Sequence, residues 1–186
     1  ENADCREKTV MSVIKFEEHP EIKMRHALMF MSEAFSIAET SHAKDLKVGA
    51  VLVKTLGDGT HRVISDGYNG TEPGEDNCCE NPDGTTKEGV LHAERNVFRK
   101  LLKSNENSMG SVLFVTRSPC NGCVEYIIDA GVTHVYFCER HKDDKPLLRL
   151  LSKNVALCQI DKQAMRDRFL SIANRIQQDK FNEETL

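Results

Sequence analysis

The chain has 186 residues, of which 39% are hydrophobic and 29% are charged, and its formal net charge is −4. These values are ordinary for a soluble globular protein, whereas proteins that bind large nucleic acids usually present a basic face, so we expect no such partner. The seven cysteines are an odd number and lack the spacing of a secreted disulfide framework. No apolar run approaches the length of a membrane span, and no signal peptide opens the chain. We therefore expect a protein of the reducing cytoplasm without a membrane partner.

The first half of the chain predicts a helix, a hairpin and a long loop. Residues 1–20 are polar and mixed, and we expect them to form an N-terminal arm. From about Ile22 to Ser41, apolar residues recur every three or four positions, which is the period of an amphipathic helix. The apolar, β-branched run 48–53 and the run 62–68 predict two antiparallel strands joined by a glycine-rich turn. Residues 72–89 are rich in turn-forming types, and a loop of this length in a compact domain is often functional.

The second half predicts an alternation of helices and strands. The expected elements are a helix that opens at His92, a strand over 112–116, a helix that ends near Ala130, a strand over 132–138, a helix around 147–151, a strand over 155–160 and a last helix with Asp161 as its N-cap. Such an alternation is typical of an α/β sandwich with mostly parallel strands after the first hairpin. We predict a three-layer αβα sandwich around a mixed five-stranded sheet, formed by a single domain over residues 1–186.

Two short motifs carry the chemistry. The first is His92-Ala93-Glu94, and the second is Ser118-Pro119-Cys120-Asn121-Gly122-Cys123. One imidazole and two thiolates are good ligands for Zn²⁺, and three protein ligands leave the fourth position open, as in catalytic zinc sites. Together they match the signature of zinc-dependent nucleobase deaminases, H-x-E followed by P-C-x-x-C. We therefore predict a catalytic zinc held by His92, Cys120 and Cys123.

Glu94 is the expected acid–base residue of this site. It is not a zinc ligand in the signature, and it lies close enough to the metal to exchange protons with an attacking water and with the base. In the alternative interpretation, Cys120 and Cys123 join Cys78 or Cys79 in a closed structural zinc site. Such a site would give Glu94 no role, and its zinc would have no open position for water.

With these motifs the sequence resembles the zinc-dependent cytidine/deoxycytidylate deaminase superfamily, and most of all its deoxycytidylate (dCMP) deaminases, including those of bacteriophages. The segments that carry the resemblance are Val48-Gly49-Ala50-Val51, Gly67-Tyr68-Asn69-Gly70-Thr71, His92-Ala93-Glu94-Arg95-Asn96 and Ser118-Pro119-Cys120-Asn121-Gly122-Cys123. The resemblance implies a cytidine deaminase-like fold and hydrolysis of dCMP to dUMP and ammonia, which would supply dUMP for thymidylate synthesis. For a viral protein it would place this activity in the host cytoplasm.

The resemblance also implies particular contacts and regulation. Asn69 would touch the base or sugar of the substrate, and the backbone around Ala93 would meet the cytosine carbonyl. The region of Asn69, Gly70 and Thr71 would contribute to activation by dCTP with Mg²⁺ and to inhibition by dTTP. Family members are commonly homohexamers, and several viral relatives bind a second, structural zinc. Here that second site could be built only from Cys78 or Cys79 with His42 or His61.

A nucleotide substrate requires a group that binds its 5′-phosphate. Arginine makes bidentate phosphate contacts, and the candidates are Arg117, which ends the strand before the second motif, Arg95, Arg99 and Arg140. Three other functions compete with a dCMP deaminase. They are the editing of tRNA or single-stranded nucleic acid, the deamination of another free base or nucleoside (cytosine, cytidine, guanine or a pterin), and a non-catalytic zinc-stabilised domain. The editing enzymes need a basic groove and stacking aromatics, whereas this chain has no tryptophan and 6% aromatic residues.

Overall fold

The structure is a computed structural model in which residues 14–183 are described, without the side chains of 179–183. Its centre is a five-stranded mixed sheet in the order β2-β1-β3-β4-β5. The strands are β1 (Gly49–Thr55), β2 (His61–Tyr68), β3 (Val112–Arg117), β4 (His134–Glu139) and β5 (Ala156–Gln159). β1 pairs antiparallel with β2 and β3, whereas β3, β4 and β5 are parallel. The predicted hairpin followed by parallel strands is therefore confirmed.

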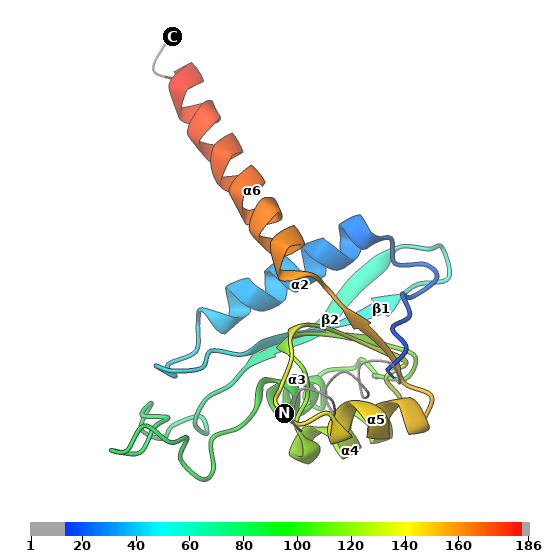
Figure 1. Cartoon of the computed structure of the whole chain (residues 1–186), viewed down its shortest axis with the longest axis vertical. Helices are drawn as coiled ribbons and strands as arrows, with labels where there is room; N and C mark the ends of the chain where they lie inside the picture. The colour runs from blue at the N-terminus through cyan, green and yellow to red at the C-terminus, as the bar shows by residue number, and fades with distance from the viewer. Residues whose placement is uncertain (1–13, 184–186) are drawn as a thin grey trace, which may run out of the picture.

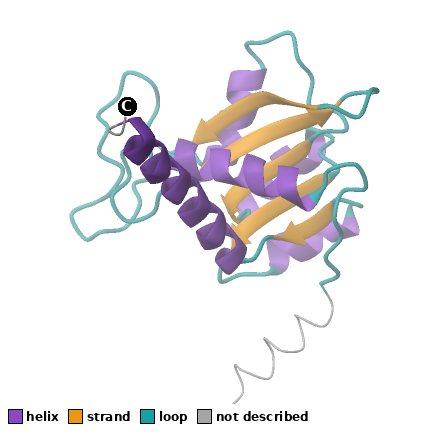
Figure 2. Ribbon diagram, turned by 90° about the horizontal axis from the view of Figure 1, so that it is seen from above, coloured by secondary structure: helices purple, strands orange, loops and turns teal. Residues whose placement is uncertain are grey.

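Helices cover both faces of this sheet (Figure 1). On one face lie α2 (Met24–Ala38) and α6 (Lys162–Glu183), and on the other lie α3 (Ala93–Leu101), α4 (Asn121–Asp129) and α5 (Lys145–Ser152). Figure 2 shows α6 and α2 in front of the strands and the remaining helices behind them. The predicted three-layer αβα sandwich is confirmed. None of the described helices is both long and apolar enough to cross a membrane.

The two sides of the sheet form two apolar cores because alternate strand residues point to opposite faces. On β3, Phe114 packs towards α2, with its ring stacked 4.7 Å from that of Tyr136, whereas Leu113 and Val115 pack towards α3 and α4. All of these side chains are fully buried. Burial on both faces holds the sheet in place. The loops that follow β3 and β4 begin at the carboxyl ends of these two strands, after Arg117 and Glu139.

The two ends of the chain can be compared only in part with the elements predicted from the sequence. The expected N-terminal arm falls largely on residues 1–13, which lie outside the described residues. Its described part packs on the sheet, since Ile14 is buried and Phe16 forms a parallel bridge with Leu157. Asp161 accepts a hydrogen bond from the Gln163 backbone N–H (3.2 Å), as expected of an N-cap. After its first turns α6 projects away from the sandwich (Figure 1).

Candidate active site

Two helix starts bring the predicted metal ligands together. His92 is the N-cap of α3 and Cys120 is the N-cap of α4, while Cys123 lies in the first turn of α4. The Nδ1 atom of His92 lies 3.3 Å from Sγ of Cys120 and 3.4 Å from Sγ of Cys123, and the two sulfurs are 3.8 Å apart. Within the described residues, these three form the only group of histidine, cysteine and acidic side chains compact enough to hold a metal ion.

The dimensions of this triangle fit zinc. Tetrahedral zinc with Zn–S bonds of about 2.3 Å and Zn–N bonds of about 2.05 Å places two sulfurs about 3.8 Å apart and a sulfur and a nitrogen about 3.6 Å apart. The observed separations agree to within about 0.3 Å. All three ligands lie on one side, so a tetrahedral ion would keep one position free for another ligand.

The protonation of the two thiols also favours a cation. Hydrogen bonds from Cys123 and then from His92 lower the pKa of Cys120 to about 3, and the bond to Cys120 together with burial raises the pKa of Cys123. The pKa of His92 is raised chiefly by its hydrogen bond to Cys120. The positive end of α4 adds to the stabilisation of a thiolate at its N-terminus. A divalent cation there would bind both sulfurs as thiolates.

Glu94 lies beside this triangle in the first turn of α3. Its side chain is 3% exposed, and burial raises the pKa of its carboxyl group. A carboxyl group with a raised pKa can hold a proton and release it near neutral pH, which is the property needed for acid–base chemistry. The predicted acid–base residue and the three predicted ligands therefore occur in one place.

A pocket of about 220 Å³ opens onto the triangle and Glu94. It is formed by the segment before β1, the residue after β2, the long loop, the start of α3, and the ends of β3 and β4. The lining residues are Leu46, Val48, Asn69, Thr86, Val90, His92, Ala93, Glu94, Arg117, Ser118, Cys120 and His141. Of the expected substrate contacts, Asn69, Ala93 and Arg117 all line this pocket.

Asn69 holds a neighbouring loop as well as facing the pocket. Its Oδ1 accepts a hydrogen bond from the Val48 backbone N–H, and its Nδ2 donates one to the Leu46 carbonyl, both at 2.8 Å. Both partners line the same pocket. Asn69 thus shapes the wall that a ligand would meet, and each of its polar atoms retains further hydrogen-bonding capacity.

Among the four candidate arginines, Arg117 alone faces this pocket. Its Nε is buried and has no hydrogen-bond partner within the described part of the chain. The other three have neighbours elsewhere: Arg140 pairs with Asp144 (2.6 Å), Arg99 pairs with Glu72 (2.7 Å), and Arg95 lies over the Tyr126 ring. A buried cationic donor without a partner is costly. Nη2 of Arg140 is also buried without a partner among the described residues, but Arg140 does not line this pocket, so Arg117 is the candidate placed to bind an anion there.

The residues expected to bind effectors divide between two pockets. Asn69 lines the pocket at the metal triangle, whereas Gly70 and Thr71 line a second pocket of about 300 Å³ on the outer side of β2 and α3. Arg99, Lys100 and Lys103 also line this second pocket together with Asp66; Lys100 pairs with Asp66, and Arg99 pairs with Glu72. One continuous segment, the end of β2, therefore borders both pockets.

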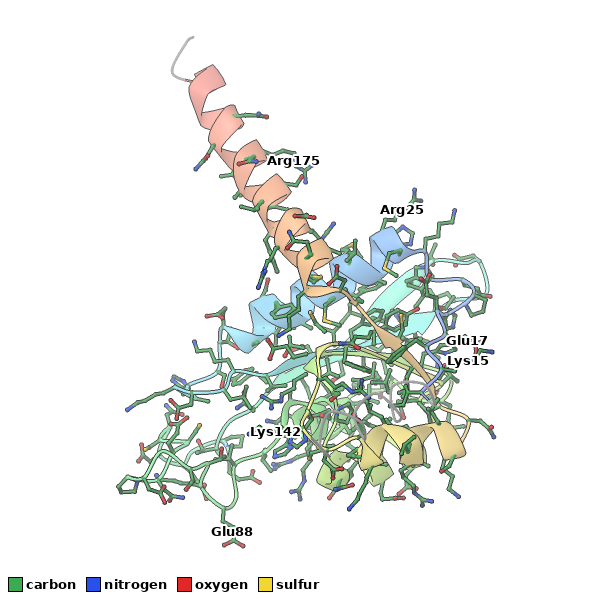
Figure 3. The ribbon with its side chains drawn as sticks, viewed as in Figure 1. Lys15, Glu17, Arg25, Glu88, Lys142 and Arg175 are labelled. Atoms are coloured by element: carbon green, nitrogen blue, oxygen red, sulfur yellow. The ribbon has the colours of Figure 1, made fainter. Side chains whose placement is uncertain are left out.

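Sequence reasoning missed several lining residues. Thr86 and Val90 come from the long loop, which is folded back on itself by the bridges Gly70–Leu91 and Glu80–Thr86. From the same loop Glu88 points outward, away from the sandwich (Figure 3). His141 follows β4, and its backbone N–H donates to Ser118 Oγ (2.8 Å). Because the carboxyl ends of adjacent parallel strands meet, the residues after β4 could have been placed beside those after β3.

The second zinc site considered from the sequence is not assembled in the described part of the chain. Neither Cys78 nor Cys79 belongs to a group of three potential ligands. His61 instead hydrogen-bonds Thr55 (3.1 Å) and packs edge-on against the ring of His26. The alternative in which Cys120 and Cys123 share a closed site with Cys78 or Cys79 is likewise wrong, since the third member of their group is His92.

Fold and site together define a zinc-dependent deaminase of the nucleobase type. Residues 24–139 match the family described as "Cytidine and deoxycytidylate deaminase zinc-binding region", and the chain belongs to this family. The structure of the dCMP deaminase of cyanophage S-TIM5 with dCMP and dUMP is similar, with a TM-score of 0.68 and 36% identity, covering 77% of this chain and 100% of that one.

Curated relatives agree with this assignment. The deoxycytidylate deaminase of Mycobacterium phage D29 is 32% identical over 122 residues, which is 58% of this chain and 90% of the relative. The deoxycytidylate deaminase of Enterobacteria phage T4 is 27% identical over 154 residues, which is 61% of this chain and 77% of the relative. ComE operon protein 2 of Bacillus subtilis is 31% identical over 118 residues, and this chain spans only 59% of its length.

Proposed function

We propose that this chain is a dCMP deaminase, which converts dCMP and water to dUMP and ammonia and so supplies dUMP for thymidylate synthesis. The observation that carries the proposal is that His92, Cys120 and the buried carboxyl group of Glu94 line one pocket, with Cys123 grouped beside His92 and Cys120. The likeness to a phage enzyme whose structure holds dCMP and dUMP supports the choice of substrate.

The residues of the pocket divide the reaction between them. Zinc, when bound, lowers the pKa of a water molecule to about 7 and so supplies a nucleophile in neutral solution. Glu94 takes up one proton of the attacking water and delivers it to the ring nitrogen beside the carbon that bears the amine. It then takes the remaining proton from the hydroxyl group on that carbon and delivers it to the amino group, which leaves as ammonia. Asn69 and the backbone at Ala93 orient the nucleotide. Each proton transfer uses the same carboxyl group, and burial raises the pKa of that group.

Arg117 is the proposed phosphate-binding residue. It combines a position on the pocket wall with a buried Nε that has no partner among the described residues. A guanidinium group matches the geometry of a phosphate and can make two parallel hydrogen bonds to it. The 5′-phosphate of dCMP would satisfy this donor, which a nucleoside without a phosphate would leave unpaired.

We further infer that the second pocket is the regulatory site, where dCTP with Mg²⁺ binds to activate the enzyme and dTTP binds to inhibit it. Gly70 and Thr71 line it beside Arg99, Lys100 and Lys103, and a triphosphate there would compete with Asp66 for Lys100 and with Glu72 for Arg99. An effector bound there would contact the end of β2, which also borders the catalytic pocket. An effector shifts an enzyme only if it binds one state better than another, so this segment is the proposed two-state element.

Assembly and location complete the proposal. As in the family that the chain belongs to, we expect residues 1–186 to act as one deaminase domain within a homohexamer. We place it in the cytoplasm, or in the host cytoplasm for a phage source, because the six cysteines of the described residues are all free.

The test is the release of ammonia from a panel of compounds by the purified zinc-loaded protein. The panel contains dCMP, CMP, dCTP, deoxycytidine, cytidine, cytosine, guanine and an adenosine-containing tRNA stem–loop. The proposal expects the highest kcat/KM for dCMP. Preference for a free base, a nucleoside or the tRNA would replace dCMP by that substrate, and no turnover of any of them would favour a non-catalytic zinc domain.

A further inference from the structure

The end of β2 is tied to the helix that carries His92 and Glu94. Ser65 Oγ donates a hydrogen bond to the Val97 carbonyl (2.8 Å), and Asn96 Nδ2 donates one to the Tyr68 carbonyl (2.8 Å). Ser65 is buried, so its bond is shielded from water. The turn of α3 that contains Asn96 and Val97 is therefore attached to one edge strand of the sheet.

The chain just before the metal ligand is tied to the same segment. Gly70 and Leu91 exchange two backbone hydrogen bonds, with N···O distances of 3.0 and 2.8 Å. Leu91 immediately precedes His92 and is itself buried. Residues 65–70, which we call the β2 end segment, thus hold the start of α3 from both sides of His92.

Within the β2 end segment, Gly67 makes the closest approach. A Cβ atom at this position would lie 2.7 Å from the Ala93 carbonyl oxygen and 2.7 Å from the Val97 backbone nitrogen. Both contacts are with backbone atoms, which cannot rotate aside as a side chain could. Gly67 does not have a positive φ, so the glycine is needed for space and not for its conformational freedom.

We propose that Gly67 is a positioning residue of the deaminase site, because its missing side chain sets the distance of α3 from the sheet. This inference rests on the proposed function. Ala93 lies between His92 and Glu94, so a displacement of its backbone moves both functional side chains relative to Cys120 and Cys123 on α4. To restore an ordinary contact of 3.4 Å from 2.7 Å, α3 would have to move by about 0.7 Å. Catalytic geometry tolerates about 0.5 Å, and a misplacement of about 1 Å can cost 10²-fold in rate.

Two other glycines provide matched controls. Gly49 approaches a helix even more closely, with a notional Cβ 2.0 Å from the Ala34 carbonyl oxygen, but that helix is α2, which contributes no residue to the pocket. Gly57, in the β1–β2 turn, has nothing within 4 Å of a notional Cβ. Gly49→Ala therefore tests a close approach to a helix that carries no metal ligand, although Gly49 itself follows Val48 of the pocket wall, and Gly57→Ala tests the substitution itself.

The experiment compares Gly67→Ala with these controls in three measurements: melting temperature, kcat and KM for dCMP, and the absorption spectrum of the cobalt-substituted protein, which reports the arrangement of the imidazole and thiolate ligands. We expect Gly67→Ala to lose about 10²-fold in kcat, with a smaller change in KM and an altered cobalt spectrum. Gly49→Ala should melt lower yet keep the spectrum and kcat of the wild type once folded. Gly57→Ala should match the wild type in all three measurements.

A folded Gly67→Ala with the wild-type spectrum and kcat would overturn the inference, as would a spectral change of equal size in Gly49→Ala. If Gly67→Ala does not fold, Asn96→Ala removes the bond to the Tyr68 carbonyl without adding an atom. The same spectral change and a lower kcat are then expected, and their absence overturns the inference. The cobalt spectrum needs no substrate, so a wild-type protein that binds cobalt but does not deaminate dCMP would defeat the proposed function and leave this test intact.

Discussion

The replacement of Arg117 by methionine tests how the pocket distinguishes a nucleotide from a nucleoside. Methionine keeps much of the aliphatic bulk of arginine and removes all five donors. A hydrogen bond to a charged group contributes about 1.5–3 kcal/mol, so the loss of the phosphate contact should lower kcat/KM for dCMP by about 10- to 150-fold. Deoxycytidine has no phosphate, so its kcat/KM should change by about threefold at most.

The structure adds a second expected result for Arg117→Met. In the absence of nucleotide, the buried Nε of Arg117 has no partner among the described residues. Since an unsatisfied buried donor costs about 1–3 kcal/mol, removing it should leave the melting temperature unchanged or higher. The assay is steady-state ammonia release with both substrates, together with thermal melting with and without dCMP. Equal losses for dCMP and deoxycytidine would refute the phosphate role, and a large drop in melting temperature would show that Arg117 is structural.

Three further predictions concern the metal, the effector and pH. Cys120→Ala should empty the zinc site and abolish activity. The control Cys138→Ala, at a buried cysteine outside the site, should keep zinc at full stoichiometry. Zinc retained by Cys120→Ala would contradict the ligand assignment. Lys103→Ala should weaken the response of dCMP turnover to dCTP and dTTP without changing the basal rate by more than about threefold, and an unchanged response would exclude Lys103 from the effector site. The rings of His19 and His134 lie 4.6 Å apart, and burial lowers the pKa of both side chains, although Glu21 and Glu17 act to raise them. The unfolded chain therefore binds more protons than the folded chain in mild acid, so the free energy of unfolding should fall as the pH drops below about 6.5. His134→Gln should reduce the fall in melting temperature between pH 7.5 and pH 5.5, and identical slopes would contradict the assignment.

Much of the fold could be predicted because local signals and burial agree. The apolar run of β1 is buried on both faces, as its composition suggests, and Asp161 caps α6 as its residue type suggests. The metal ligands could be predicted because their spacing is local: Cys120 and Cys123 share a helix turn, and His92 sits at a second helix start. In each case the sequence signal lies within a few residues, although the contacts of His92 with the two cysteines join segments 28 and 31 residues apart.

What could not be predicted depends on contacts between distant segments. Thr86 reaches the pocket only because the long loop folds back through two isolated bridges, and no periodicity marks such a fold. Gly67 was interpreted from the sequence only as a member of the segment Gly67-Tyr68-Asn69-Gly70-Thr71 that carries the family resemblance, whereas its close approach to α3 becomes visible only in three dimensions. Likewise, Asn69 and Gly70 are adjacent in sequence and yet face different pockets.

The central claim is that a buried carboxylate at the zinc site shuttles the protons of dCMP hydrolysis. Its most direct test is dCMP deamination by Glu94→Gln, measured together with zinc content and melting temperature, with the outward-pointing Glu88→Gln as the matched control. Glutamine is nearly the same size and cannot accept the proton, and a general acid–base group contributes about 10²–10⁴-fold. Because Glu94 would serve several transfers, the account predicts a folded, zinc-loaded Glu94→Gln that is slower by about 10⁴-fold, and a Glu88→Gln with wild-type activity. A folded, zinc-loaded Glu94→Gln within about tenfold of the wild-type rate would contradict the account.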